Sequence, residues 1–399
     1  MIYSDPYTST LNFVPQGDRS LGINPYRLLL DPYKEIPEYK PIEINKKLLR
    51  EEIQQKLYEY FTKAAGCDQP TKCDPAKLME IKMNTIKGYT PEFRAIGNMI
   101  NDSNTKHYVV NGKHSIVLDS DPELAKKLAQ ETDSIIHDFL KRSSKKLPTK
   151  IYIVSEELNI NKPHLPFEVG VAKHVREKDR IGMIELIAGE YVDKSGKRIK
   201  SLENQDTLSH EVGHVILETL NPEASREVHE AFADSVAFLT QASKEESIRK
   251  IIQQNIDLTK TNFISQISEN SHYYRQLQEH PFYKDPNDKK DYIRNLAGNY
   301  VYDPKEDNPY KKSLSLSSTI YSSWAEYIKY LQSTGLPKEV AIKKANETFK
   351  DLLVKTAETP ENIDIPKFAN SFIQNIKDPI LKEIFTKNAI QRKIPINSD

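Results

Sequence analysis

The stretch from Ser209 to Phe238 constrains the fold of this chain more than any other part of the sequence. It reads SHEVGHVILETLNPEASREVHEAFADSVAF and is apolar enough for buried helices, yet it holds three of the chain's ten histidines and six acidic side chains. Asn221-Pro222 ends the first of two predicted helices, and either Asn221 or Ser225 can cap the second. Because buried polar groups need partners, the fold must bring these side chains together or pair them elsewhere.

The first predicted helix carries His210 and His214, four residues apart and therefore on one face, close enough to share a metal ion. Glu211 lies about 100° around the helix from His210, beside such an ion without having to ligate it. In the pattern H-E-x-x-H, the imidazoles bind zinc and the glutamate takes a proton from the zinc-bound water. A solvated helix with two surface histidines is the alternative. It conflicts with the apolar residues around much of the helix: Leu208, Val212, Val215, Ile216 and Leu220.

The second predicted helix offers a third ligand, which a catalytic zinc site normally requires in addition to a water. Glu230 and Asp234 are four residues apart and share a helix face. Two carboxylates are costly to bury unless they bind something charged. The helix also has an apolar stripe, formed by Val228, Phe232, Val236 and Leu239.

Together, HEVGH and HEAFAD resemble the gluzincin, or thermolysin-like, branch of zinc metallopeptidases, in which a second helix supplies a glutamate ligand in an E-x-x-x-D pattern. The resemblance implies that His210, His214 and Glu230 ligate one Zn²⁺ ion and that Glu211 is the general base. Asp234 matches the carboxylate that holds a ligand histidine in the correct tautomer. The likeness is strong over residues 205–241 and weaker outside them.

Two departures from the thermolysin pattern stand out. The gap between His214 and Glu230 is shorter than in thermolysin, which implies a tight connection between the helices. The downstream region NPYKKSLSLSSTIYSSW also has no histidine to steady the oxyanion. An active peptidase needs some donor there besides the metal. The candidate donors are Tyr310, His272, Tyr273 and Tyr274, and each is also compatible with a purely structural role. His229 is expected to point off the ligand face, beside the site or on the surface.

Upstream of the motif, the sequence indicates a sheet with a covering helix. The segment HYVVNGKHSIVL predicts a hairpin with a type I′ turn at Asn111-Gly112. A helix capped by Asp121 follows, and strands are predicted in TKIYIVS, FEVGVAKHV and IGMIELIAGEYV. After Ser201, helical periods dominate to the end of the sequence, with breaks at Pro- and Gly-containing segments.

We therefore expect an α+β, zincin-like, two-lobed metallopeptidase, with a mixed sheet and helices before a mostly helical C-terminal lobe. The expected parts are an N-terminal arm and helical region over 1–100 that restrains the cleft, a catalytic lobe over 101–241 and a helical lobe over 242–399. One amphipathic helix is predicted from Asn45 to Gly66. By the family resemblance, a strand near Ile181–Val192 is expected to pair with extended substrate as an edge strand.

The bulk composition excludes several classes of protein. Lys plus Arg and Asp plus Glu number 57 each, so no global field attracts nucleic acid or an anionic membrane. No apolar run approaches the roughly 20 residues of a membrane span, and the first residues do not resemble a cleavable signal. We expect a soluble, cytoplasmic protein, with secretion without a cleavable signal as an alternative. Cys67 and Cys73 are interpreted as free thiols or a local bridge.

The sequence thus predicts a zinc-dependent endopeptidase that acts on a protein or peptide substrate. Aminopeptidase action is less expected, because no Gly-Ala-Met-Glu-Asn-like segment is found. Two alternatives stay open. The first is a non-catalytic interaction protein stabilised by zinc, in which the missing oxyanion histidine reflects lost turnover. The second is an effector or toxin that cleaves one particular protein.

Overall fold

The computed structural model describes several ranges of the chain, and the chain divides into two compact units. The first unit comprises Met1–Asn111 and Leu118–Lys126, and the second comprises Gly112–Val117 and Lys127–Asp399. The described ranges are 38–44, 106–147, 150–157, 172–177, 180–188, 190–192, 198–200, 205–267 and 294–397. The predicted helix from Asn45, both cysteines and nearly all of the predicted N-terminal arm lie outside these ranges.

In the first unit, a short antiparallel pair forms from segments far apart in the sequence. Strand β1 (Ile42–Glu43) pairs with β2 (Tyr108–Asn111), with Ile42 opposite Val109. The backbone N–H groups of Tyr39 and Ile44 extend this pairing by donating to the carbonyls of Asn111 and His107. Val109 and Val110 are buried, so the strand contributes apolar side chains to a core.

The strands predicted on either side of Asn111-Gly112 form as β2 and β3 (Ser115–Asp119), but the predicted type I′ turn is wrong. Neither Asn111 nor Gly112 has the positive φ that this turn requires. Instead, the carboxylate of Asp133 organises the turn. It accepts hydrogen bonds from the backbone N–H of Lys113 and His114 and from the hydroxyl of Ser115. A side chain distant in the sequence therefore replaces the local backbone preference of an Asn-Gly pair.

Helix α5 (Pro122–Leu140) begins as predicted, because Asp121 accepts hydrogen bonds from the N–H groups of Glu123 and Leu124. The predicted strand TKIYIVS forms with shifted bounds, and the described part of FEVGVAKHV lies in a strand. IGMIELIAGEYV, predicted as one strand, forms two strands that belong to different sheets. In the second unit, the sheet runs in the order β3-β4-β6-β5. The bounds are β4 (Ile151–Glu157), β5 (Ala172–Glu177) and β6 (Arg180–Ala188), while β7 (Glu190–Val192) and β8 (Arg198–Lys200) make a separate pair.

The expectation that the strand near Ile181–Val192 is an edge strand is wrong for β6. This strand pairs in parallel with β4 and antiparallel with β5, so residues 183–186 have a partner on both sides. Their backbone groups are already used in the sheet, and an extended peptide cannot pair with them. In the described part of the sheet, β6 is an interior strand and β5 is the strand beyond it.

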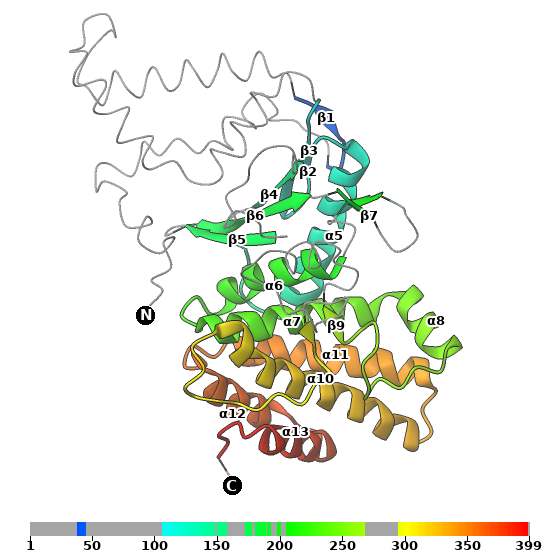
Figure 1. Cartoon of the computed structure of the whole chain (residues 1–399), viewed down its shortest axis with the longest axis vertical. Helices are drawn as coiled ribbons and strands as arrows, with labels where there is room; N and C mark the ends of the chain where they lie inside the picture. Colours follow the sequence, from blue (N-terminus) through cyan, green and yellow to red (C-terminus); the bar gives the residue numbers. More distant parts are fainter. Residues whose placement is uncertain are drawn as a thin grey trace, which may run out of the picture. The chain divides into compact units, whose positions relative to one another are not determined.

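Helices stack in layers below this sheet in the second unit (Figure 1). Helix α6 (Gln205–Leu220) packs against β5 and β6 and against α7 (Arg226–Ser243). Helix α7 in turn packs against α10 (Pro309–Ser333) and α11 (Lys338–Ala357). The remaining elements are α8 (Glu245–Gln253), α12 (Ile365–Asn375), α13 (Pro379–Gln391) and the antiparallel pair of β9 (Gln266–Ile267) and β10 (Arg294–Asn295). Helix α6 therefore lies between the sheet and α7, and α10 and α11 cover α7.

The prediction that helices dominate after Ser201 is confirmed for the described residues, and several predicted breaks fall between helices. Asn221-Pro222 separates α6 from α7, and Gly335-Leu336-Pro337 separates α10 from α11. The break at His280-Pro281 lies outside the described residues. Helix α7 runs through the expected domain boundary between residues 241 and 242, and that division stays a prediction. The mixture of helices and sheet is compatible with the α+β class.

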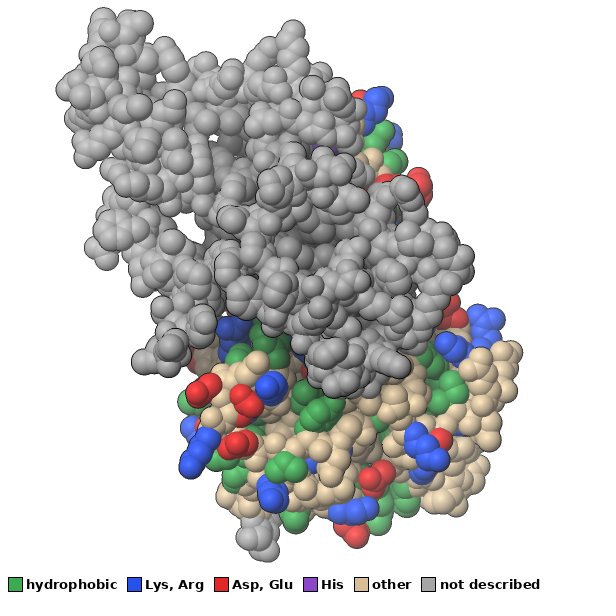
Figure 2. Space-filling model, in the orientation of Figure 1, with side chains coloured by type: hydrophobic (Ala, Val, Ile, Leu, Met, Phe, Trp, Pro, Cys, Tyr) green, Lys and Arg blue, Asp and Glu red, His purple; other side chains and the backbone are tan. Residues whose placement is uncertain are grey.

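The described surface carries both signs of charge (Figure 2), as the equal numbers of basic and acidic residues in the sequence lead one to expect. On the face shown in Figure 2, lysine, arginine and acidic side chains are interspersed over the described surface. None of the helices within the described ranges is long and apolar enough to cross a membrane.

Candidate metal centre

Helix α6 brings the HEVGH residues into the interior. Nearly every residue from Thr207 to Leu220 is buried, which confirms the prediction that this helix does not lie on the surface. His210, Glu211 and His214 are themselves buried, with 7%, 8% and 9% of their surface exposed. The helix is held in place at its C-terminal end, where the ammonium of Lys145 donates to the carbonyl of Leu220.

Helix α7 lies unusually close to α6 at the level of the motif, and Gly213 permits this approach. A Cβ atom at position 213 would lie 2.7 Å from the Cα atom of Ala233, a distance that real Cβ atoms essentially never show. The glycine between Val212 and His214 is therefore required by packing and not by helix formation, which glycine disfavours. This contact sets the separation between the histidines of α6 and the carboxylates of α7.

The connection between the helices is short, as the spacing predicts, and spans residues 221–225. Ser225 occupies the N-cap position of α7, but its side chain makes no capping hydrogen bond. Asn221 does not cap α7 either: its side-chain amide donates to the carbonyl of Thr359. The backbone N–H of Ser225 donates to the carbonyl of Ile363. The loop between α11 and α12 thus fixes the connection.

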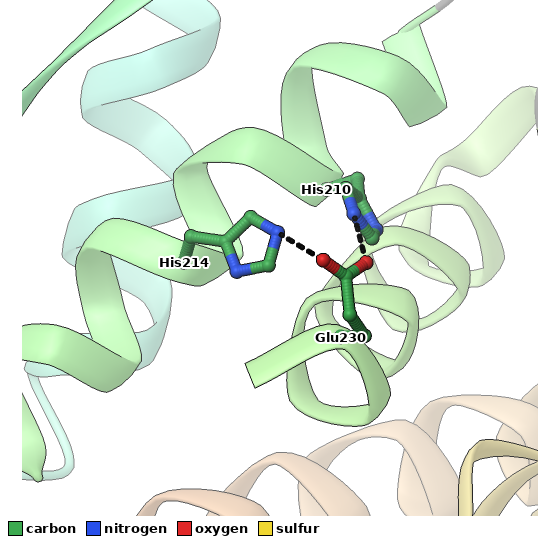
Figure 3. Close-up of side chains that lie close together, drawn as sticks. All are labelled: His210, His214 and Glu230. Atoms are coloured by element: carbon green, nitrogen blue, oxygen red, sulfur yellow. Dashed lines mark ion pairs between the residues drawn. The ribbon is translucent and has the colours of Figure 1, made fainter. Parts of the chain in front are cut away.

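His210, His214 and Glu230 converge at the interface of α6 and α7 (Figure 3). Their potential ligand atoms all lie within 4.8 Å of one another. Nε2 of His210 is 3.4 Å from Oε2 of Glu230, and Nε2 of His214 is 3.7 Å from Oε1 of the same carboxylate. The imidazole rings meet edge to face, with centroids 4.8 Å apart. Two imidazole nitrogens and one carboxylate oxygen, all buried, form a group that could hold a metal ion.

Asp234 contacts the opposite side of the His210 ring. Its Oδ1 atom lies 3.1 Å from Nδ1 of His210, while Nε2 of the same ring faces Glu230. A carboxylate at one ring nitrogen fixes the tautomer and the orientation of the imidazole, which keeps the other nitrogen available as a ligand. The i, i+4 spacing of Glu230 and Asp234 therefore places one carboxylate on each side of the ring.

Arg294, on β10, completes the charge balance of the group. Its guanidinium donates to Oδ1 of Asp234 and, over 3.1 Å, to Oε2 of Glu230. The side chain is only 13% exposed. The β9–β10 pair positions it, because Arg294 lies opposite Ile267 on β9 and β9 packs against α7. We call His210, His214, Glu230, Asp234 and Arg294 the metal-site cluster.

The cluster shifts the pKa values of its members in opposite directions. Burial lowers the pKa of His210, but the contacts with Asp234 and Glu230 outweigh burial and raise it to about 9. Burial raises the pKa of Glu230, whereas the two histidines and Arg294 lower it to about 2. The pKa of Asp234 is likewise lowered despite burial, chiefly by Arg294. Without a metal, the cluster is a network of paired charges, and metal binding at neutral pH would displace the proton of His210.

The other residues singled out in the sequence have mixed outcomes. The ring of His229 stacks on that of His214, with centroids 5.8 Å apart, so it lies beside the cluster. Tyr310 is at the start of α10, and its hydroxyl accepts a hydrogen bond from Arg226 over 3.2 Å. His272, Tyr273 and Tyr274 lie outside the described residues. The identity of the oxyanion donor therefore stays a prediction for all four candidates.

Sequence reasoning missed Arg294 and the role of Gly213. The signal for the arginine was indirect: two carboxylates in an apolar helix require a positive partner. With 57 lysines and arginines in the chain and no motif around RNLAGNY, nothing in the sequence singles out this one. Gly213 occupies a variable position of the H-E-x-x-H pattern, and only the approach of α7 reveals why it is small.

Comparison with known proteins assigns the chain to no family, so a functional proposal rests mainly on the geometry of the site. No protein-family model matches the chain, and no curated protein matches it.

Proposed function

We propose that this chain is a zinc-dependent endopeptidase of the gluzincin type. The observation that carries the proposal is the convergence of His210, His214 and Glu230 from two helices. Asp234 lies beside Nδ1 of His210, the ring nitrogen that faces away from Glu230. These residues are the ones that the HEVGH and HEAFAD segments suggest as zinc ligands and ligand-orienting carboxylate.

The donor set fits zinc. Catalytic zinc sites use three protein ligands drawn from imidazole nitrogen and carboxylate oxygen and leave a position for water. Hard cations such as Ca²⁺ and Mg²⁺ prefer sets made of oxygen atoms alone, so two imidazoles argue against them. Two carboxylates outnumber the one guanidinium of Arg294, so with neutral imidazoles the cluster carries a net negative charge, which favours a bound cation.

Each residue has a role in this proposal. When bound, a zinc ion lowers the pKa of a water to about 7 and polarises a carbonyl oxygen. Glu211, which follows His210 on α6 and is buried, accepts the proton of that water and passes it to the leaving amine. Asp234 orients His210. Arg294 positions Glu230 by hydrogen bonding to its carboxylate.

The test is hydrolysis of unfolded casein by wild-type protein and by Glu211→Gln. Glutamine keeps the size of the side chain but cannot accept the proton, so the rate should fall by about 10²- to 10⁴-fold. Zinc content should stay near one per chain, because Glu211 is not assigned as a ligand. A chelator should abolish wild-type hydrolysis.

The outcomes separate the proposal from its rivals. Wild-type protein with full zinc content and no hydrolysis of casein would contradict a general endopeptidase. In that case, a panel of folded candidate substrates would distinguish an enzyme of narrow specificity from a non-catalytic zinc protein. Loss of zinc from Glu211→Gln would overturn the role of Glu211 as base.

A further inference from the structure

Tyr310 connects the protein surface to the metal-site cluster. Its ring centroid is 5.2 Å from the guanidinium carbon of Arg294 and 5.4 Å from that of Arg226. The tyrosine is 42% exposed, whereas the side chain of Arg294 is 13% exposed. The ring therefore faces solvent and packs on the guanidinium that bonds Glu230 and Asp234.

The position of Tyr310 is fixed by the start of α10. The side chain of Asn308 caps the helix by accepting from the N–H groups of Tyr310 and Lys311, and Pro309 fills the first helical position. Lys312, one turn into α10, lies 3.8 Å from the carboxylate of Glu227 in the first turn of α7. The start of α10 is thus tied to the start of the helix that carries Glu230.

We propose that Tyr310 is a positioning residue of the metal site, which holds Arg294 against Glu230 and Asp234 and thereby slows the release of a bound metal. This inference rests on the proposed metal site but not on catalysis. Tyr310 was considered above only as an oxyanion donor; the contacts with Arg294 and Arg226 give its ring a separate role.

The physical basis is the restraint of the Glu230 carboxylate. A carboxylate ligand leaves a metal by rotating away from it, and the hydrogen bond from Arg294 opposes this rotation. Arg294 can hold Glu230 only while its own guanidinium is held. The aromatic face attracts the guanidinium and keeps water from one side of it. Loss of the ring frees Arg294 and, through it, Glu230.

The experiment compares three variants of the full chain loaded with one equivalent of zinc. Tyr310→Leu keeps an apolar side chain but removes the aromatic face. Tyr310→Phe keeps the aromatic face and removes only the hydroxyl that bonds Arg226. Tyr330→Leu is the matched control, because Tyr330 lies near the other end of the same helix and stacks on Tyr327. Zinc release into excess chelator is followed with a coloured indicator.

We expect Tyr310→Leu to release zinc roughly threefold to thirtyfold faster than wild type, the range that a cation–π contact supports. Tyr310→Phe and Tyr330→Leu should release it at the wild-type rate. With cobalt in place of zinc, the visible spectrum should change in Tyr310→Leu alone, because the orientation of Glu230 becomes less fixed.

Three results would overturn the inference. They are a wild-type release rate in Tyr310→Leu, equal acceleration in Tyr310→Phe and equal acceleration in Tyr330→Leu. The first denies any effect of Tyr310, the second assigns it to the hydroxyl, and the third assigns it to loosening of α10. Wild-type protein that binds no zinc would instead contradict the proposed metal site, and with it this inference.

Discussion

The metal-site cluster and a second group of charges, which joins α5 to α11, differ in which charge is kept from water. In the metal-site cluster, the side chains of Glu230 and Asp234 are 6% and 0% exposed. In the second group, the side chain of Lys350 is 2% exposed, whereas the side chain of its partner Asp138 is 29% exposed. We call this second group the α5–α11 cluster, and its members are Asp138, Arg142, Glu347, Lys350 and Asp351.

The α5–α11 cluster satisfies its buried cations with acids that reach solvent. Nζ of Lys350 lies 2.6 Å from Oδ2 of Asp138, and Arg142 pairs with Asp138, Glu347 and Asp351. Its acids therefore keep part of their hydration, and the cations of these ion pairs are lysine and arginine side chains. In the metal-site cluster, the acids are buried together with two imidazoles that they face. The contrast teaches that buried charge alone does not support a metal site; the proposed site rests on the convergence of imidazole and carboxylate donors.

Glu230→Ala should show the largest difference between the clusters. It removes one of three proposed ligands, and zinc affinity should fall more than about a hundredfold, the upper range for loss of a partner outside the ligand set. The measurement is a competition titration with a zinc indicator. The matched change Glu347→Ala in the α5–α11 cluster should leave zinc affinity unchanged. Equal affinities in wild type and Glu230→Ala would remove Glu230 from the ligand set.

Asp234→Asn should have a smaller effect on the same titration. Asparagine fits the space but no longer provides a charged acceptor for Nδ1 of His210, and it weakens the pairing with Arg294. Loss of such an orienting carboxylate typically lowers metal affinity by about 10- to 100-fold. Asp138→Asn is the control for loss of a paired aspartate elsewhere. If both substitutions change zinc affinity equally, the orienting role of Asp234 is wrong.

Lys350→Met tests the α5–α11 cluster. We expect it to leave zinc affinity unchanged and to lower stability modestly. Methionine fills the volume, but Asp138 loses one cation and retains Lys141 and Arg142. We expect the free energy of unfolding to fall by about 2 kcal/mol, less than for a fully buried pair because Asp138 is partly hydrated. Urea unfolding measures the change. A zinc affinity that falls together with stability would show that the two clusters are coupled.

Lys350→Met should also alter how the free energy of unfolding changes as the pH falls. Burial raises the pKa of Asp138, but hydrogen bonds from Lys141 and Lys350 outweigh burial and hold the pKa below its ordinary value. A carboxyl whose pKa is lower in the folded state contributes stability at neutral pH, and this contribution is lost as the pH falls below about 4. Lys350→Met should therefore lose less stability than wild type on acidification over that range. An equally steep loss in both proteins would exclude Lys350 as a cause.

The elements that carry the site could be predicted because local patterns specify them. Apolar periodicity indicated both helices, and the spacing of His210, His214, Glu230 and Asp234 placed their side chains on defined faces. The same reasoning placed α5 from its Asp121 cap and the break between α10 and α11 from Gly335 and Pro337. These features depend on residues within a few positions of one another.

The parts that could not be predicted depend on distant residues. Asp133 overrides the turn preference of Asn111-Gly112 from a helix later in the chain. Strand β6 is interior because β4 and β5 pair on either side, which its own sequence does not reveal. Arg294 reaches the cluster from 60 residues beyond Asp234. In each case tertiary contact decides the outcome, and local sequence carries little information about it.

The most direct test of the metal site is a crystal structure of the zinc-loaded protein with anomalous diffraction data collected at the zinc absorption edge. We predict one strong anomalous peak between α6 and α7, about 2.0–2.2 Å from Nε2 of His210, Nε2 of His214 and a carboxylate oxygen of Glu230. Data from Glu230→Ala crystals should lack the peak. A zinc-saturated wild-type crystal with no peak at this position, or with its zinc bound by other residues, would contradict the account.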